Sequence, residues 1–148
     1  MLACTDGLGV WLASNGLTGA HPAGAEALRH LCAAREALTA AVDGSPQQAA
    51  PLVDAVLAHG RIRARLTAEG PTEEPEFADP SWGPAWLAAR SYLDLLSRAP
   101  ERIRVCSGTG CVLHFFDTSR NGTRRWCSMA ACGNRAKASR HYARSKEN

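Results

Sequence analysis

Apolar residues recur every three to four positions over residues 23–42, and this spacing predicts an amphipathic helix. The apolar stripe consists of Leu28, Leu31, Cys32, Leu38 and Val42, and Arg35 is its polar interruption. Asp43 and Gly44 end this helix. A second helix is predicted after Ser45, with Pro46 in its first turn and Gln48 in the capping-box position, and it stops near Gly60.

The pattern then changes. Over residues 61–67 three arginines alternate with Ile62, Ala64 and Leu66, which predicts a half-buried strand with its arginines toward solvent. Residues 68–81 carry three prolines and five acids without a period and are predicted to form a loop. Residues 82–98 again predict a helix, whose apolar stripe consists of Trp82, Trp86, Ala89, Leu93 and Leu96.

The first hundred residues contain few candidates for a catalytic or ligand-binding site. They contain no phosphate-binding glycine loop and no convincing nucleophile–base pair, so we expect no enzyme here. The composition is that of a folded protein, with 45% hydrophobic and 21% charged residues. No apolar run approaches the roughly 20 residues of a membrane span, and the first ten residues make a poor signal peptide. We therefore expect a cytoplasmic protein whose six cysteines are thiols or metal ligands.

The net charge of +3 conceals two opposite segments. Residues 1–101 carry a net charge of −5, whereas residues 102–148 carry +8. Four of the six cysteines lie in the basic segment, in the order Cys106-x4-Cys111-x15-Cys127-x4-Cys132. Two short spacers around a longer insert allow four thiolates to surround one ion, which is typical of a closed structural Zn²⁺ site without an open position for catalysis. A rubredoxin-like iron site and a set of buried thiols are the alternatives.

The residues around the cysteines predict the order of elements in this segment. Residues 102–105 form a short strand, residues 112–116 and 123–126 form a hairpin around Asn121-Gly122, and residues 133–146 form a helix. Knuckle, β-hairpin and helix in this order indicate a treble-clef-like zinc finger. The whole chain is then mainly α with minor β, an α+β protein, with a small helical N-terminal domain before the finger.

Basic side chains suggest what the finger contacts. Lys137, Arg140 and Arg144 share one face of the predicted helix, and Arg120, Arg124 and Arg125 precede Cys127. With one ion and four thiolates the segment carries about +6, a charge that attracts the phosphates of double-stranded DNA. Some of this charge, that of Arg135 above all, offsets the zinc tetrathiolate. The alternative is a protein-interaction module whose basic face docks an acidic partner, for example the acidic loop at residues 69–79.

Residues 116–142 resemble the CGNR zinc finger family, which is named after the motif formed here by Cys132-Gly133-Asn134-Arg135. The resemblance covers about residues 101–145 and implies that Cys106, Cys111, Cys127 and Cys132 hold zinc and that the finger binds DNA. Asn134 and Arg135 then organise the finger through helix capping and contacts near the metal.

Residues 6–100 resemble the ABATE domain that usually precedes this finger, although the family's opening segment, similar to Asp-Phe-Val-Asn-Thr, is absent. We thus expect a shortened ABATE-like domain over residues 1–100 and a CGNR-type finger over residues 101–148. The resemblance implies a stress-induced bacterial transcription regulator. Its N-terminal domain is expected to sense a small-molecule effector or to form a homodimer, and no membrane is expected to take part.

Overall fold

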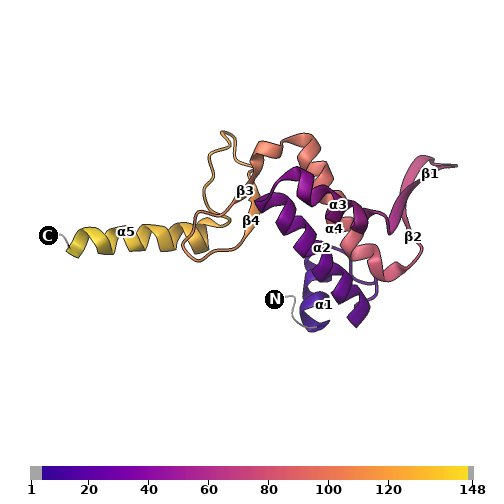
Figure 1. Ribbon diagram of the computed structural model, residues 1–148, viewed down its shortest axis with the longest axis horizontal. Helices are drawn as coiled ribbons and strands as arrows, with labels where there is room; N and C mark the ends of the chain where they lie inside the picture. Colours follow the sequence, from indigo (N-terminus) through magenta and orange to yellow (C-terminus); the bar gives the residue numbers. More distant parts are fainter. Residues whose placement is uncertain (1–4, 147–148) are drawn as a thin grey trace. The chain divides into compact units, whose positions relative to one another are not determined.

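A computed structural model describes residues 5–146 of the chain, apart from the side chains of Thr5, Pro46, Arg140, His141, Ala143, Arg144 and Lys146. The chain divides into two compact units, Met1–Asp94 and Leu95–Asn148, which are described separately. The elements before the finger (Figure 1) are α1 (Thr5–Ser14), α2 (Ala25–Asp43), α3 (Pro46–Leu57), β1 (Gly60–Thr67), β2 (Gly70–Phe77), the 3-10 turn η1 (Pro80–Trp82) and α4 (Gly83–Arg98). A second 3-10 turn, η2 (Pro100–Arg102), leads to β3 (Ile103–Val105), β4 (His114–Phe116), the π-helical turn η3 (Met129–Gly133) and α5 (Asn134–Lys146).

The start of α3 confirms the capping pattern of the sequence. The Ser45 side chain accepts a hydrogen bond from the backbone N–H of Gln48, and a proline occupies the first turn. Pro51 lies inside this helix, one turn from its start. Because the first four N–H groups of a helix have no carbonyl partner in it, Pro46 costs little, whereas Pro51, the sixth residue, removes one intrahelical hydrogen bond.

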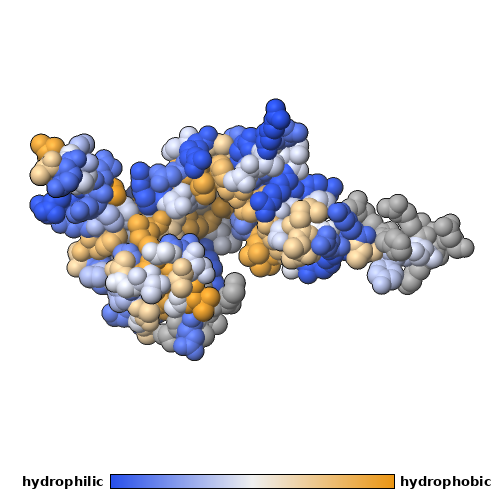
Figure 2. Space-filling view, turned by 180° about the vertical axis from the view of Figure 1, so that it is seen from behind, coloured by the Kyte–Doolittle hydropathy of each residue, from blue (hydrophilic) through white to orange (hydrophobic). Residues whose placement is uncertain are grey.

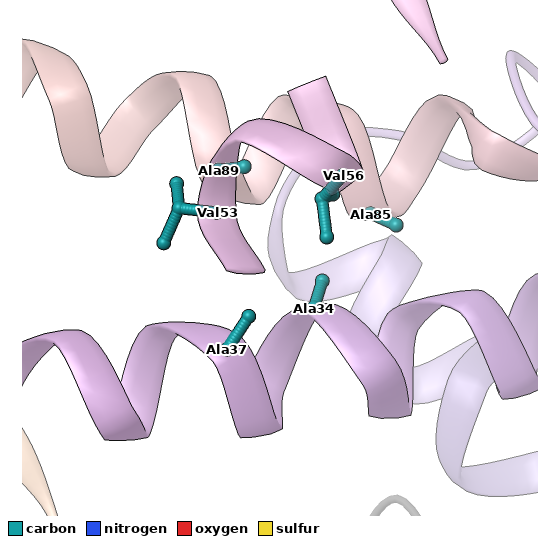
Figure 3. Close-up of a cluster of buried hydrophobic side chains, with 6 residues drawn as sticks. All are labelled: Ala34, Ala37, Val53, Val56, Ala85 and Ala89. Atoms are coloured by element: carbon teal, nitrogen blue, oxygen red, sulfur yellow. The ribbon is translucent and has the colours of Figure 1, made fainter. Parts of the chain in front are cut away.

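Two clusters of buried side chains hold the first unit together. In the larger one, side chains of α2, α3 and α4 point toward one another (Figure 3): Ala34, Ala37, Val53, Val56, Ala85 and Ala89. The other joins α1 to α2 through Leu8, Leu12, Ala27 and Leu31. Most of these side chains are small, so the helices pack closely around a thin core.

The buried stripe of α2 differs from the predicted one. It consists of Ala27, Leu31, Ala34 and Ala37, whereas Leu28, Cys32 and Leu38 are half-buried. The stripe follows alanines because they permit close helix contact. Arg35 therefore interrupts nothing, since its side chain lies on the exposed face.

The prediction of a loop over residues 68–81 is wrong, because residues 70–77 form strand β2, paired antiparallel with β1 over eight residue pairs. Arg61 and Arg63 both bond to Glu76, with shortest distances of 2.5 and 3.2 Å, and Arg65 bonds to Glu74 at 3.4 Å. These cross-strand charge pairs favour the pairing of β1 with β2. The prolines of residues 70–77 make this strand hard to predict from the sequence.

The prediction that β1 is half-buried is also wrong. Ile62 is 42% exposed and Leu66 is 85% exposed. Figure 2 shows the hairpin as mostly hydrophilic, with a hydrophobic group at its outer end. Most residues of the ribbon are exposed, and no other described element pairs with either of its edges.

Helix α4 begins where the sequence predicts a helix, after a turn capped by Asp79, whose carboxylate accepts the Ser81 N–H at 2.9 Å. Trp86 is buried, and its indole N–H donates to the Leu57 carbonyl at 2.9 Å. This bond ties α4 to the end of α3. No helix in the described part of the chain is long and apolar enough to cross a membrane.

The second unit contains a β-hairpin, but its strands differ from those predicted. β3 pairs antiparallel with β4, and the segment between them carries Cys106 and Cys111. Residues 123–126 form no strand, although the Ser107 N–H donates to the Arg125 carbonyl at 2.9 Å. Side-chain bonds to Asp117, described below, hold the loop that precedes these residues, so a second β-ladder does not form. The predicted fold class, α+β with a C-terminal four-cysteine finger, is confirmed.

Candidate metal centre

Four cysteines from three segments converge in the second unit. Cys106 follows β3, Cys111 closes the knuckle, Cys127 precedes η3 and Cys132 lies within η3. Their Sγ atoms all lie within 4.8 Å of one another. The Sγ atom of Cys127 lies 3.8 Å from that of Cys111 and 3.8 Å from that of Cys132.

These distances fit one tetrahedral ion. Zinc–sulfur bonds of about 2.3 Å place the sulfur atoms of a tetrahedron about 3.8 Å apart. Thiolates are soft ligands that favour Zn²⁺ over hard cations such as Mg²⁺ or Ca²⁺. With four thiolates the coordination is complete, so the centre suits a structural ion and offers no open position for a reacting water.

Backbone N–H groups point at the sulfur of Cys106. Gly108 and Cys127 donate to this sulfur, with N···S distances of 3.4 and 3.3 Å. The N–H of Cys127, more than that of Gly108, lowers the pKa of the Cys106 thiol to about 6. Burial, together with the neighbouring sulfurs, raises the pKa of the Cys127 thiol to about 12. The cluster therefore favours a thiolate at Cys106, whereas a bound cation would favour deprotonation of Cys127 and Cys132, whose pKa values are raised.

The knuckle requires glycine at one position for reasons of space. A Cβ atom at Gly108 would lie 3.0 Å from both Cβ and Sγ of Cys132 and 3.4 Å from Sγ of Cys106. Gly110 has a φ of +71°, in the region that favours glycine. Gly108 thus lets the backbone approach the sulfur atoms closely, whereas Gly110 permits the turn.

Arg135 contacts the centre from the first turn of α5. Its Nη2 donates to Sγ of Cys132 at 3.3 Å. A guanidinium here neutralises part of the negative charge of a zinc tetrathiolate, as predicted for a residue near the metal. The adjacent Asn134 is exposed, and the side-chain cap of this region is instead Ser128, whose Oγ accepts the Ala131 N–H at 3.3 Å.

Asp117 is the buried polar anchor of the finger, with 0% of its surface exposed. Its Oδ1 accepts from the hydroxyl and the N–H of Ser119 at 2.6 and 2.9 Å, and its Oδ2 accepts from the Arg124 N–H at 2.9 Å. Chiefly through the Ser119 hydroxyl, these bonds lower the pKa of the Asp117 carboxyl. These bonds hold residues 117–124 as a compact loop that precedes Cys127 in the chain.

Arginine side chains brace the same loop. Arg102 donates to the carbonyls of Asp117 and Ser119 at 2.9 and 2.8 Å. Arg124 donates to the carbonyls of Trp126, at 2.8 Å, and of Cys127, and its guanidinium lies 4.9 Å from the centre of the Phe115 ring. Arg124, one of the predicted DNA contacts, therefore has several partners within the finger.

The other predicted DNA contacts fall into two groups, those whose side chains the structure describes and those whose side chains it does not. Lys137, Arg120 and Arg125 are exposed, and the Arg125 guanidinium lies 5.4 Å from the centre of the Trp126 ring. Arg140 and Arg144 lie on α5, but their side chains are outside the described ones. The roles of Asp117 and Arg102 were not predicted, although Asp117 is the single acid within residues 102–146, which was a signal that it is buried and paired.

Comparison with protein families yields two matches. The family model "CGNR zinc finger" matches residues 102–145. The ABATE model, described as "Putative stress-induced transcription regulator", matches residues 1–99. No curated protein matches the chain at a significant level. The four-thiol cluster and the CGNR match together support one zinc ion in this centre.

Proposed function

We propose, from the premise that the chain belongs to the ABATE family and carries a CGNR zinc finger, that it is a transcription regulator whose finger binds double-stranded DNA. Its N-terminal unit is the part that would sense an effector or form a homodimer. The zinc ion supplies a structural cross-link between the knuckle and the start of α5.

One observation carries this proposal: the charges of the finger are sorted by sign. Asp117 is the single acid of residues 102–146, and it is buried and paired. Exposed cations remain at Arg120, Arg125 and Lys137. A surface with positive charges and no carboxylate attracts a polyanion strongly.

Helix α5 supplies the surface that would contact DNA. It starts two residues after Cys132, so a metal held by Cys132 would fix its first turn. Residues 137, 140 and 144 are spaced by three and four, which places them on one side of the helix. A helix is the right width for the major groove, and Lys137, Arg140 and Arg144 are proposed to contact phosphates or base edges there. Arg120 and Arg125 are proposed as supporting contacts, with Arg124 acting mainly within the finger.

The test is fluorescence anisotropy with duplex DNA of random sequence over a series of salt concentrations. The zinc-loaded protein is expected to bind, and chelation of zinc is expected to abolish binding. The plot of log K against log salt has a negative slope. In the variant K137A/R140A/R144A, each lost phosphate contact should make this slope less steep by about 0.9. Zinc content should be unchanged, because none of the three residues is a ligand.

The variant R29A/R35A/R90A is the matched control. It removes three exposed arginines from helices of the first unit, and alanine is a good helix former there. This control should bind DNA with the slope of the wild type. An equal loss in both triple variants would show that total charge, and not the face of α5, causes binding.

Absence of binding at low salt, with zinc in place, would contradict the proposal and favour a finger that docks an acidic partner. The acidic segment of this chain is a weak candidate for that partner. Glu74 and Glu76 already pair with arginines of β1.

A further inference from the structure

A cavity of about 340 Å³ lies in the first unit between α2 and α3. Leu52 and Val56 of α3 form one wall, and Ala33 and Ala37 of α2 form the other. Ala37 and Val56 are also core residues (Figure 3), so the cavity borders the packed interior. Its volume is at the lower end of the range for small-molecule sites.

An aromatic stack flanks this cavity, which is open to solvent. Trp82, which lines it, lies between two imidazole rings that are nearly parallel to the indole. The ring centres of His30 and His59 lie 3.8 and 3.5 Å from that of Trp82. Nδ1 of His30 is also hydrogen-bonded with Oγ of Ser81, at 3.1 Å. The indole is therefore held in place before any ligand arrives.

Glu36 is the charged residue of the lining. Among the residues that the structure describes, no ion pair or hydrogen bond engages its carboxylate. No lysine or arginine lines the cavity, and residues 1–101 carry a net charge of −5. A largely apolar cavity with one exposed, unpaired carboxylate favours ligands that are apolar and positively charged.

We propose that this cavity binds an organic cation with an apolar, preferably aromatic, body. The body lies between the wall of Leu52 and Val56 and the wall of Ala33 and Ala37, at the edge of the Trp82 indole, and the ammonium group pairs with Glu36. The binding itself is independent of DNA. That such a cation acts as an effector rests on the proposed regulatory function.

Three matched probes test the proposal on the full-length, zinc-loaded protein. They are 2-(1-naphthyl)ethylamine and the alcohol and carboxylic acid with the same ring and chain length. NMR titration of the methyl groups of Leu52 and Val56 and of the Trp82 indole N–H reports binding at the cavity. The amine is expected to bind about 5-fold more tightly than the alcohol, and the acid most weakly.

Two variants locate the charge and the space. Glu36→Gln should remove the preference, so that amine and alcohol bind within about 2-fold of each other. Glu26→Gln, on the same helix, is the control and should keep the preference. Ala55→Phe places a large side chain on the lining and should weaken all three probes.

The proposal is overturned if the three probes bind equally, or if their shifts map elsewhere than on the cavity. It is also overturned if Glu36→Gln retains the preference of the wild type. Circular dichroism checks that each variant is folded. Since no DNA is present, failure here would leave the DNA-binding proposal untouched.

Discussion

Among the residues that the structure describes, the first unit buries twelve hydrophobic residues, whereas the buried hydrophobic residues of the second unit are Cys106 and Cys132. The finger instead exposes large apolar side chains: Val112 is 84% exposed, Leu113 56% and Val105 53%. Its cohesion comes from four sulfur atoms and from the hydrogen bonds around Asp117. A unit of about 50 residues is too small to be stabilised by a hydrophobic core alone. The metal centre therefore takes the place of a core in the finger.

The largest expected effect that separates the two units is that of zinc removal. Structural zinc in small fingers contributes about 10–16 kcal/mol of apparent binding free energy. Chelation should therefore unfold residues 102–146 and leave α1–α4 folded. Circular dichroism should show partial loss of helix. NMR should show unchanged methyl signals for the larger buried cluster, which joins α2, α3 and α4. Loss of both units together would contradict the comparison.

Trp86→Ala is the opposite experiment, directed at the core of the first unit. Trp86 is 4% exposed and donates to the Leu57 carbonyl. Its truncation should lower the free energy of unfolding of this unit by about 3–5 kcal/mol, measured by urea denaturation. Zinc content should stay at one ion per chain. Trp86→Phe, which keeps most of the buried ring, is the milder control.

Arg135→Ala should weaken the finger without affecting the first unit. The lost guanidinium no longer offsets the negative charge at Cys132, so zinc affinity should fall by about 10–100-fold in a chelator competition. Lys137→Ala, two positions further along α5, is the matched control and should retain zinc like the wild type. Equal zinc retention in both variants would show that the contact at Cys132 is dispensable.

The smallest effect is expected in the β1–β2 hairpin. The hydrogen bond from Arg61 lowers the pKa of the Glu76 carboxyl below its ordinary value of 4.5. The contribution of this ion pair to the stability of the hairpin is thus fully present above pH 4.5. It is lost as the pH falls through the lowered pKa of Glu76. Glu76→Gln should speed amide exchange in the hairpin near neutral pH, and this difference from the wild type should vanish in acid. The midpoint of thermal unfolding should move by no more than about 2 °C, because exposed ion pairs contribute little.

The metal centre was predictable from the sequence because its chemistry is local. Spacers of four residues bring two thiols together whatever the rest of the chain does, so the four ligands follow from their positions. The hairpin of the finger was not predictable. Asn121-Gly122 is a strong turn signal, and Gly122 has a φ of +60°, but the N–H groups of Ser119 and Arg124, on either side of this turn, donate to the Asp117 side chain and not to a neighbouring strand.

In the first unit, helices were easier to predict than the surfaces that they bury. The periods over residues 23–42 and 82–98 correspond to α2 and α4. The buried positions, however, depend on which face meets a neighbour, and alanines such as Ala34 carry little signal. Strand β2 escaped prediction because prolines disfavour strands in general, whereas its pairing depends on arginines of β1.

Pro71 and Pro75 also determine how this ribbon behaves among many copies of the chain. Both lie on β2 and have no N–H, so they can occupy only positions that do not donate to β1. The outer edge of β2 therefore lacks two of the donors that another strand would need. Strand β1 carries Arg61, Arg63 and Arg65, and charged side chains on an edge strand disfavour its pairing with a second copy. The exposed Leu66 therefore lies in a ribbon that is a poor template for further strands.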